Sequence, residues 1–292
     1  MTARRFVDLH THSNASDGAL EPAEVVRLAD QARLAAVAVT DHDTIYGLAQ
    51  ARQAAASFPE LRLVGGIEIS ASFPHGTMHL LGLGIDPDSP SLQDLLRTLQ
   101  AARAERNPKI LARLAELGMN LEWEDVMAIA RPGPDEGRIV GRLHIAEAMR
   151  RRGYVSDTQQ AFHRWIGVDR PAYVDKDRLS PADAIRGIRQ AGGLAILAHP
   201  VHLNCANRLQ LERVVRELVH HGLQGIEVYH SDHDDVHTRI YLDLARHLGL
   251  EVSGGSDFHG SAKPTVQLGR PRVPIAALGE GIRRILRLNK SG

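Results

Sequence analysis

The chain has 292 residues, with 35 basic and 35 acidic side chains and therefore no formal net charge. This balance excludes the broad basic surface of a protein that grips duplex nucleic acid through many phosphates, but it allows a small anion or a few nucleotides in a local pocket. Hydrophobic residues at 43% and charged residues at 24% are ordinary values for a folded, soluble protein with a large core.

Cysteine and histidine usage narrows the chemistry. Cys205 is the single cysteine, which excludes an internal disulfide and a cysteine-rich zinc site and favours a cytoplasmic location. The chain reaches Asp8 without a long apolar stretch, so neither a signal peptide nor a membrane anchor is predicted. By contrast, there are 16 histidines against 5 phenylalanines and 5 tyrosines, and histidine is the commonest metal ligand in proteins.

Short apolar runs alternate with amphipathic stretches along most of the chain. The predicted strands are residues 6–9, 36–39, 61–69, 78–85, 194–197, 225–228 and 250–253. The predicted helices between them are residues 22–33, 45–56, 181–190, 209–220 and 236–248. Pro22 and Pro181 lie where a first helical turn would begin, and Gly249 lies just past a helix end. This alternation favours an α/β fold with a parallel sheet, and seven strands indicate a closed or nearly closed barrel.

Residues 101–171 break the alternation. The stretches 92–117, 123–130, 139–152 and 158–165 are predicted to be helical, without a convincing strand between them. We expect a barrel domain of residues 1–100 and 172–292, with a helical insertion domain at residues 101–171. Residues 131–134 are predicted to form a turn, and residues 131–152 are locally basic.

Acidic and imidazole side chains occur at the end of almost every predicted strand. In chain order they are Asp8, His10, His12, Asp17, Asp41, His42, Asp43, Glu68, His79, His199, Glu227, His230, Asp257 and His259. In a barrel, the carboxyl ends of the strands form the catalytic face. His10 and His12 project to the same side of an extended chain and can chelate one ion. Charged groups converging there would be costly unless cations compensated them, so the pattern predicts a metal site.

Each of these residues alone also has a structural interpretation. A lone histidine at a strand end is more often a hydrogen-bonded structural group, and His-x-His by itself is a weak signal. It is the repetition at strand after strand that favours metal binding. The acidic run at 232–235 lies beyond its strand and is predicted to be a solvated loop with a helix cap. Gly65-Gly66 and Gly254-Gly255 lack the spacing of a P-loop.

These motifs together resemble a known family, the polymerase-and-histidinol-phosphatase (PHP) family of amidohydrolase-like metal enzymes. The matching motifs are Asp8-x-His10-x-His12, Ser16-Asp17-Gly18, Thr40-Asp41-His42-Asp43, Glu68, His199-Pro200 and Ser256-Asp257-x-His259. The resemblance covers roughly residues 5–100 and 172–262. Gly141-Arg142-x-His144-Ile145-Ala146 is similar to the branch of 3′,5′-nucleotide bisphosphate phosphatases and short-RNA 5′→3′ exonucleases. That branch usually has proline between the arginine and the histidine, where this chain has Leu143.

The resemblance implies a distorted (β/α)₇ barrel that holds two or three divalent ions. Its implied ligands are His10, His12, Glu68 and Asp257 for the first ion, Glu68, His79 and His199 for the second, and Asp17, His42 and His259 for the third. Imidazole and carboxylate ligands without thiolate suit Mn²⁺, Fe²⁺ or Zn²⁺. The resemblance favours manganese.

Further residues are candidates for contact with substrate. Arg142 and His144 can hold a phosphate, although a surface salt bridge is the alternative for Arg142. His202 and Asn204 follow on the loop after His199, with structural and functional interpretations evenly balanced. The last candidate is Asp43, which with Asp41 flanks His42, where one of the two acids can orient an imidazole.

Two residues are candidate catalytic groups. His230 can contact phosphate or deliver a proton to the leaving oxygen, and Asp257 is expected both to bind metal and to act in catalysis. A water activated by the ions is the expected nucleophile.

The resemblance implies hydrolysis of the 3′-phosphate of a nucleoside 3′,5′-bisphosphate, such as the adenosine compound, to the 5′-monophosphate. One alternative is a 5′→3′ exonuclease that releases 5′-mononucleotides from short RNA or DNA, and the two activities can coexist. Further alternatives are a histidinol-phosphate phosphatase and a non-enzymatic metal-binding module. The expected partners are a nucleotide and short single-stranded RNA or DNA, with no membrane and no obligate protein partner.

Overall fold

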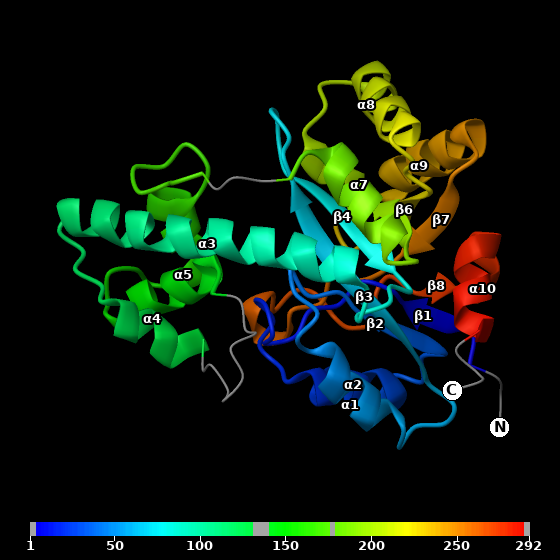
Figure 1. The fold of residues 1–292 in the computed structure, drawn as a ribbon, viewed down its shortest axis with the longest axis horizontal. Coiled ribbons are helices and arrows are strands. Elements are labelled where there is room, and N and C mark those ends of the chain that lie inside the picture. The colour runs from blue at the N-terminus through cyan, green and yellow to red at the C-terminus, as the bar shows by residue number, and fades with distance from the viewer. Residues whose placement is uncertain (1–3, 131–139, 176–178, 289–292) are drawn as a thin grey trace. The chain divides into compact units, whose positions relative to one another are not determined.

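The computed structural model describes residues 4–130, 140–175 and 179–288 (Figure 1). The chain forms two compact units, one made of Met1–Leu95 with Leu179–Gly292 and the other of Leu96–Arg178. We call them the barrel unit and the helical unit. The boundaries predicted from the sequence are 100/101 and 171/172, so the observed helical unit begins earlier and ends later along the chain.

The barrel unit contains one eight-stranded sheet with the order β7-β6-β5-β4-β3-β2-β1-β8. Its strands are β1 (Phe6–Asp8), β2 (Ala36–Val39), β3 (Arg62–Ala71), β4 (Met78–Leu83), β5 (Leu194–Leu197), β6 (Gly225–Tyr229), β7 (Glu251–Gly254) and β8 (Val273–Pro274). β7 approaches β1, because Leu9 donates a hydrogen bond to the Gly254 carbonyl at 3.2 Å and Thr11 bridges to Phe258. The predicted barrel is therefore confirmed, as a nearly closed one.

The predicted parallel pairing does not hold for β4, which is antiparallel to both β3 and β5. The connection from β3 to β4 is too short for a parallel crossover, which needs about a dozen residues or more. The reversal has a consequence for His79. Since β4 runs the other way, its first residues lie at the rim where the parallel strands end, and His79 pairs with Ser70 there. A second antiparallel strand, β8, was not predicted and pairs with β1.

Helices cover the outside of the barrel. They are α1 (Pro22–Gln31), α2 (Leu48–Ala55), α7 (Pro181–Gln190), α8 (Arg208–His220), α9 (Asp235–Leu248) and α10 (Glu280–Leu288), the last of which was not predicted. α1 and α2 pack together beside β2 and β3, and α9 packs beside β6 and β7 (Figure 1). Asp234 caps α9 by accepting from the amides of Val236 and His237, which confirms the predicted cap. Gly249 ends α9 with a φ of 66°, a conformation that glycine adopts without strain.

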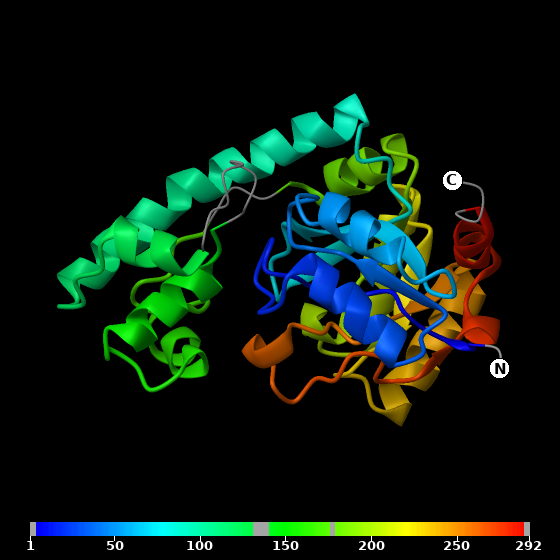
Figure 2. The ribbon, with the colours of Figure 1, turned by 90° about the horizontal axis from the view of Figure 1, so that it is seen from below.

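The helical unit contains most of α3 (Pro90–Glu116), together with α4 (Trp123–Ala130), α5 (Arg142–Arg151), α6 (Thr158–Ala161) and the π-helix η1 (Phe162–Ile166). α4 and α5 gather on one side of α3 (Figure 2). Ile110 and Leu114 of α3 are buried with Val126 of α4 and Ile145 of α5 in one apolar cluster. The predicted helix at 158–165 is thus partly a π-helix, and the predicted turn at 131–134 lies outside the described residues.

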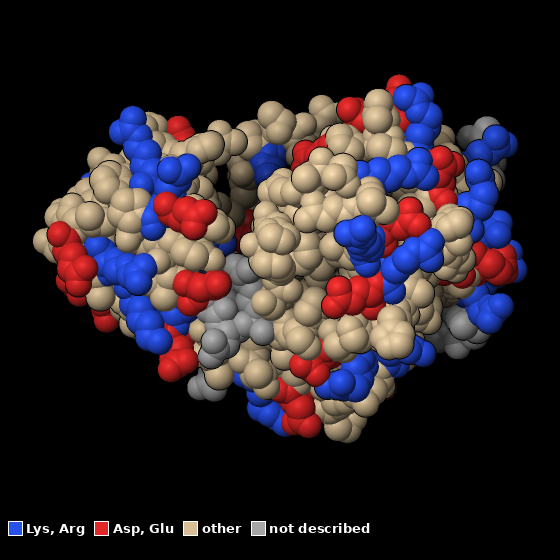
Figure 3. All heavy atoms as spheres, turned by 90° about the horizontal axis from the view of Figure 1, so that it is seen from above, with Lys and Arg blue, Asp and Glu red and all other residues tan. Residues whose placement is uncertain are grey.

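Apolar residues of the strands fill the barrel, among them Val7, Leu81 and Ile196, none of which is exposed. Among the described residues, no helix combines the length and the apolar character needed to cross a bilayer. On the face drawn in Figure 3, basic and acidic side chains are interspersed, without a broad patch of one sign. That face therefore agrees with the neutral composition.

Candidate metal centre

The rim of the barrel brings all nine predicted metal ligands into one cluster. Most of them follow the strands β1, β2, β5 and β7, while Glu68 lies within β3 and His79 is the second residue of β4. Their ligand atoms form overlapping groups with all atoms within 4.8 Å of one another, namely His10, His12, Glu68 and Asp257; His42, Glu68 and His79; and His12, Asp17, His42 and His259. His199 joins the cluster through Nε2, which lies 2.9 Å from Glu68 Oε1. Residues distant in sequence thus converge on Glu68.

Glu68 is fully buried, and its two carboxylate oxygens face different histidines. Oε2 lies 3.3 Å from His10 Nε2 and 3.1 Å from His12 Nε2. Oε1 lies 2.9 Å from His79 Nδ1 and 2.9 Å from His199 Nε2. A carboxylate that presents one oxygen to each of two imidazole pairs has the geometry of a bridging ligand between two cations.

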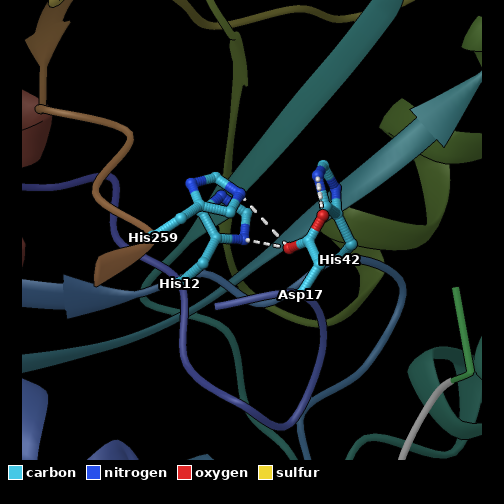
Figure 4. Close-up of side chains that lie close together, drawn as sticks. All are labelled: His12, Asp17, His42 and His259. Carbon is cyan, nitrogen blue, oxygen red and sulfur yellow. Dashed lines mark ion pairs between the residues drawn. The ribbon is translucent and has the colours of Figure 1, made fainter. Parts of the chain in front are cut away.

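The third group surrounds Asp17, whose carboxylate lies among three imidazoles (Figure 4). His259 Nε2 and His12 Nδ1 lie 3.2 Å and 3.6 Å from its Oδ1, and His42 Nε2 lies 3.7 Å from its Oδ2. The other ring nitrogen of His42 lies 3.0 Å from Glu68 Oε2. His42 therefore lies between the second and third groups, whereas the family resemblance implied the third alone.

Two buried aspartates hold the loops that carry these ligands. Asp8 accepts hydrogen bonds from the amide and hydroxyl of Ser256, at 2.8 Å and 2.6 Å, and so ties the loop after β7 to β1. Asp41 accepts from the amide and hydroxyl of Ser13, at 2.8 Å and 2.6 Å, and also from Ser16. Burial raises the pKa of both carboxyl groups, and these hydrogen bonds oppose that shift. Both aspartates are thus engaged by the loops.

Three residues of the rim have left-handed backbone conformations that are unusual for side chains other than glycine. The φ values are 55° for Asp43, 23° for His199 and 57° for Asp257. Such conformations each cost on the order of 1–3 kcal/mol and persist where the surrounding structure determines them. Their concentration beside the cluster indicates that the loops are shaped to aim these side chains.

Burial and neighbouring charges shift the pKa values of the cluster's histidines in opposite directions. Burial raises the pKa of Glu68, but nearby imidazoles outweigh that effect and hold it well below its usual value. Burial lowers the pKa of His12, but Asp257 and Glu68 raise it to about 10. For His42 and His199, burial is the largest effect on the pKa and lowers it to about 3 in each. Adjacent rings therefore differ widely in their affinity for a proton.

Several buried ring nitrogens of the cluster have no hydrogen-bond partner among the described residues. They include His10 Nε2, both nitrogens of His12 and His42 Nδ1, together with Glu68 Oε2. Buried polar atoms are rarely left unpaired, because each costs about 1–3 kcal/mol. Lone pairs of imidazole and carboxylate aimed at one small volume are the donor set that divalent transition metals take. The residues present therefore fit the predicted ions.

Comparison with known proteins agrees with this geometry. The model of the PHP domain family matches residues 8–179. This chain belongs to the PHP family. The 3′,5′-nucleoside bisphosphate phosphatase of Chromobacterium violaceum is 37% identical to it over 255 residues, 87% of each chain.

Two further relatives extend the comparison. The 5′-3′ exoribonuclease of Haemophilus influenzae is 32% identical over 252 residues, which cover 86% of this chain and 89% of the relative. A solved structure from Bifidobacterium adolescentis, described as a predicted metal-dependent phosphoesterase, superposes with a TM-score of 0.85 at 29% identity. It covers 96% of this chain and 95% of its own. The PHP fold inferred from the sequence motifs is therefore confirmed.

The sequence pointed to Glu227 but gave it no role in this PHP protein. Its buried carboxylate lies 3.1 Å and 3.2 Å from His10 Nδ1 and accepts the backbone amide of His199 at 2.8 Å. It thus holds two residues of the cluster, His10, which faces Glu68 Oε2, and His199, which faces Glu68 Oε1. The available signal was a charged residue in the middle of the otherwise apolar strand β6.

The substrate-contact candidates of the barrel unit differ in their surroundings. Asp43 is buried and accepts the amide of Ser70 at 2.9 Å. The ring of His202 lies beside that of His199, tilted by 36° with ring centroids 4.4 Å apart, and its Nε2 lies 2.9 Å from Asp232 Oδ2. Asn204 ends the short 3-10 helix that contains His202 and is exposed. His202 therefore places its ring against a histidine of the cluster.

Arg142 and His144 belong to the helical unit of the PHP protein. The Arg142 guanidinium donates to the Ile166 carbonyl at 3.2 Å and lies 5.7 Å and 5.4 Å from the ring centroids of Phe162 and Tyr173. His144 Nδ1 accepts the amide of Gly141 at 3.0 Å. These contacts fix both side chains at the start of α5, and their role in substrate binding stays a prediction.

Proposed function

We propose that this PHP protein is a metal-dependent phosphoesterase that removes the 3′-phosphate of nucleoside 3′,5′-bisphosphates, such as the adenosine compound. The observation that carries the proposal is Glu68, with one carboxylate oxygen facing His79 and His199 and the other facing His10, His12 and His42. The choice of substrate is supported by the relative in Chromobacterium violaceum that bears this name.

We assign His10, His12, Glu68 and Asp257 to a first ion, Glu68, His79 and His199 to a second, and Asp17, His42 and His259 to a third. Manganese is the proposed metal, with zinc or iron as alternatives, since the ligands are imidazoles and carboxylates without thiolate. When bound, such ions activate water near neutral pH and neutralise charge on a phosphoryl group. The protein's own part is to hold these side chains in place and to bind the phosphate.

We propose that five residues contact the nucleotide, namely Asp43, Arg142, His144, His202 and Asn204. His230 and Asp257 are the proposed catalytic residues. The free thiol of Cys205 agrees with the cytoplasmic location that we propose.

The direct test is phosphate release by the purified protein, loaded with Mn²⁺, from a panel of phosphate esters. We expect nucleoside 3′,5′-bisphosphates to be hydrolysed with the highest kcat/KM and to give the 5′-monophosphate as product. Release of the 5′-phosphate instead, or no turnover of any bisphosphate, would overturn the assignment. Histidinol phosphate belongs in the panel, since that substrate is the remaining monoester alternative.

A second candidate function is 5′→3′ exonuclease activity on short RNA or DNA. The relative in Haemophilus influenzae favours it. The same ligand set serves both reactions, because each one cleaves at the phosphate on the 3′ side of a 5′-phosphorylated nucleoside. Mononucleotide release from a 5′-phosphorylated pentaribonucleotide should then occur stepwise from the 5′ end, and an intact pentamer after prolonged incubation would exclude this function.

A further inference from the structure

The histidines at the rim are held in different tautomers, and the tautomer decides what each ring can do. A neutral imidazole has one N–H and one lone pair, so the hydrogen-bond partner of one nitrogen fixes the role of the other. A nitrogen that bears hydrogen cannot bind a metal ion, and a nitrogen with a free lone pair can. The partners in this structure therefore separate metal ligands from hydrogen-bond donors.

His10 and His259 are held as metal ligands. The Glu227 carboxylate can only accept, so His10 carries its hydrogen on Nδ1 and turns the lone pair of Nε2 toward Glu68. His259 Nδ1 lies 2.8 Å from the backbone carbonyl of Asp257, which also can only accept. The lone pair of His259 Nε2 consequently faces Asp17 at 3.2 Å.

His230 is held in the opposite tautomer. The backbone amide of Asp232 donates to its Nδ1 at 3.0 Å, which uses the lone pair of that nitrogen. The hydrogen of the neutral ring is therefore on Nε2. This Nε2 is buried without a hydrogen-bond partner and lies 3.6 Å from Asp257 Oδ2. Although His230, His10 and Glu227 lie close enough to hold an ion, His230 presents a donor there and has no lone pair to offer.

Lys263 brings a positive charge to the same place. Its ammonium donates to Asp257 Oδ2, the oxygen that also faces His230. The other oxygen of Asp257 turns inward, with Oδ1 3.2 Å from His12 Nε2. The Lys263 side chain is 39% exposed and that of Asp257 is 5% exposed, so solvent reaches this ion pair from the Lys263 side. An ammonium has three N–H donors, and Asp257 uses one of them.

We propose that His230 Nε2–H and Lys263 form a donor pair that binds a phosphate group of the substrate at the outer side of Asp257, and that His230 is not a metal ligand. The identity of the anion rests on the proposed phosphoesterase function. A neutral N–H donor and a cation beside a metal site suit a phosphate, because they bind its oxygens without competing for the metal ions. Lys263 also offsets the repulsion between the phosphate and the carboxylate of Asp257.

Variants of His230 separate the donor role from metal binding. His230→Ala removes the donor, whereas His230→Gln keeps an N–H group near the position of Nε2. On the Mn²⁺-loaded protein, elemental analysis should give the same number of ions per chain for both variants and the wild type. The dissociation constant of inorganic phosphate, measured by calorimetry, should rise roughly tenfold in the alanine variant and less in the glutamine variant. Loss of one ion from His230→Ala would show that the ring is a ligand and overturn the proposal.

Variants of Lys263 test the second member of the pair. We expect Lys263→Met to raise the dissociation constant of inorganic phosphate roughly tenfold, and Lys263→Arg to stay within about threefold of the wild type, with the ion count unchanged in both. Lys109→Met, which removes an exposed lysine of α3, is the matched control and should change neither quantity. Unaltered phosphate binding in Lys263→Met would overturn the donor pair.

The tautomers can be observed directly. In Zn²⁺-loaded protein with ¹⁵N-labelled histidine, long-range proton–nitrogen spectra distinguish hydrogen on Nε2 from hydrogen on Nδ1. The signal that disappears in His230→Gln should show hydrogen on Nε2, and an Nδ1–H signal would contradict the inference. These readouts do not depend on turnover. A protein that binds phosphate as predicted but hydrolyses no nucleotide would refute the proposed function alone.

Discussion

The barrel unit and the helical unit differ in whether their buried polar side chains have hydrogen-bond partners. In the helical unit, buried Asn107 accepts from Arg106 at 2.8 Å and donates to the Val140 carbonyl at 2.9 Å. Within the described residues, every buried side-chain polar atom without a hydrogen-bond partner lies in the barrel unit, and those of His10, His12 and Glu68 face the rim cluster. Polar groups that the protein satisfies itself support the fold, whereas those left unsatisfied at one point indicate a ligand.

The largest effect should come from the residue on which the rim cluster converges. Glu68→Gln removes the charge that is shared between two groups of imidazoles, and we expect kcat/KM to fall about a thousandfold or more, since bound ions supply several kcal/mol of charge stabilisation. Elemental analysis should show fewer Mn²⁺ ions per chain. The control is Glu116→Gln, an exposed change in the helical unit. If Glu68→Gln kept its full metal content and full turnover, the unpaired polar atoms of the barrel unit would no longer indicate a bound ligand.

In the helical unit, a substitution in the core should lower stability without changing metal binding. Ile145 is fully buried in its apolar cluster, so Ile145→Ala should lower the free energy of unfolding by about 2–5 kcal/mol, measured by urea denaturation. The number of Mn²⁺ ions bound under native conditions should not change, because the rim cluster belongs to the other unit. Leu117→Ala, at a residue that is 42% exposed, serves as the control with a much smaller loss. A fall in metal content in Ile145→Ala would contradict this independence.

A substitution of Glu227 tests whether a residue that holds two proposed metal ligands affects the affinity for Mn²⁺. Its carboxylate accepts from both His10 and His199, and glutamine, with one acceptor oxygen, leaves one of these donors unpaired. Glu227→Gln should therefore weaken Mn²⁺ binding about 10- to 100-fold in a metal titration, the range found when partners of metal ligands are replaced. Glu251→Gln, another carboxylate of the barrel unit, which accepts the amide of Gly281, should bind Mn²⁺ as the wild type does. Equal affinities in both variants would argue against the role given to Glu227.

The smallest expected effect concerns Arg142. Arg142→Lys keeps the charge but weakens the contacts with Phe162 and Tyr173, and we expect a loss of unfolding free energy of about 0.5–1 kcal/mol. If Arg142 also binds the nucleotide, KM for a 3′,5′-bisphosphate should rise while the ion count stays constant. An unchanged KM with reduced stability would leave Arg142 with a structural role only. Steady-state kinetics and denaturation of the same preparation decide between the two.

Local patterns in the chain predicted much of the fold and most of the candidate site. The strands 36–39 and 194–197 and the helices 123–130 and 181–190 were predicted with the bounds that the structure shows, because hydrophobic periodicity, proline and glycine are local signals. The α10 helix and the two-residue strand β8 were missed. In β8, the partner β1 lies at the other end of the chain, so no local pattern reveals the pairing.

By itself the sequence determined which side chains gather at the rim. His, Asp or Glu just beyond the end of a strand is delivered to the catalytic face whatever its neighbours are, so His10, His199 and Asp257 could be recognised one strand at a time. The tertiary structure alone decided the tautomer of His10. The partner of His10 is Glu227, 217 residues away, and a hydrogen bond across that separation depends on how the strands close around one another rather than on any nearby residue.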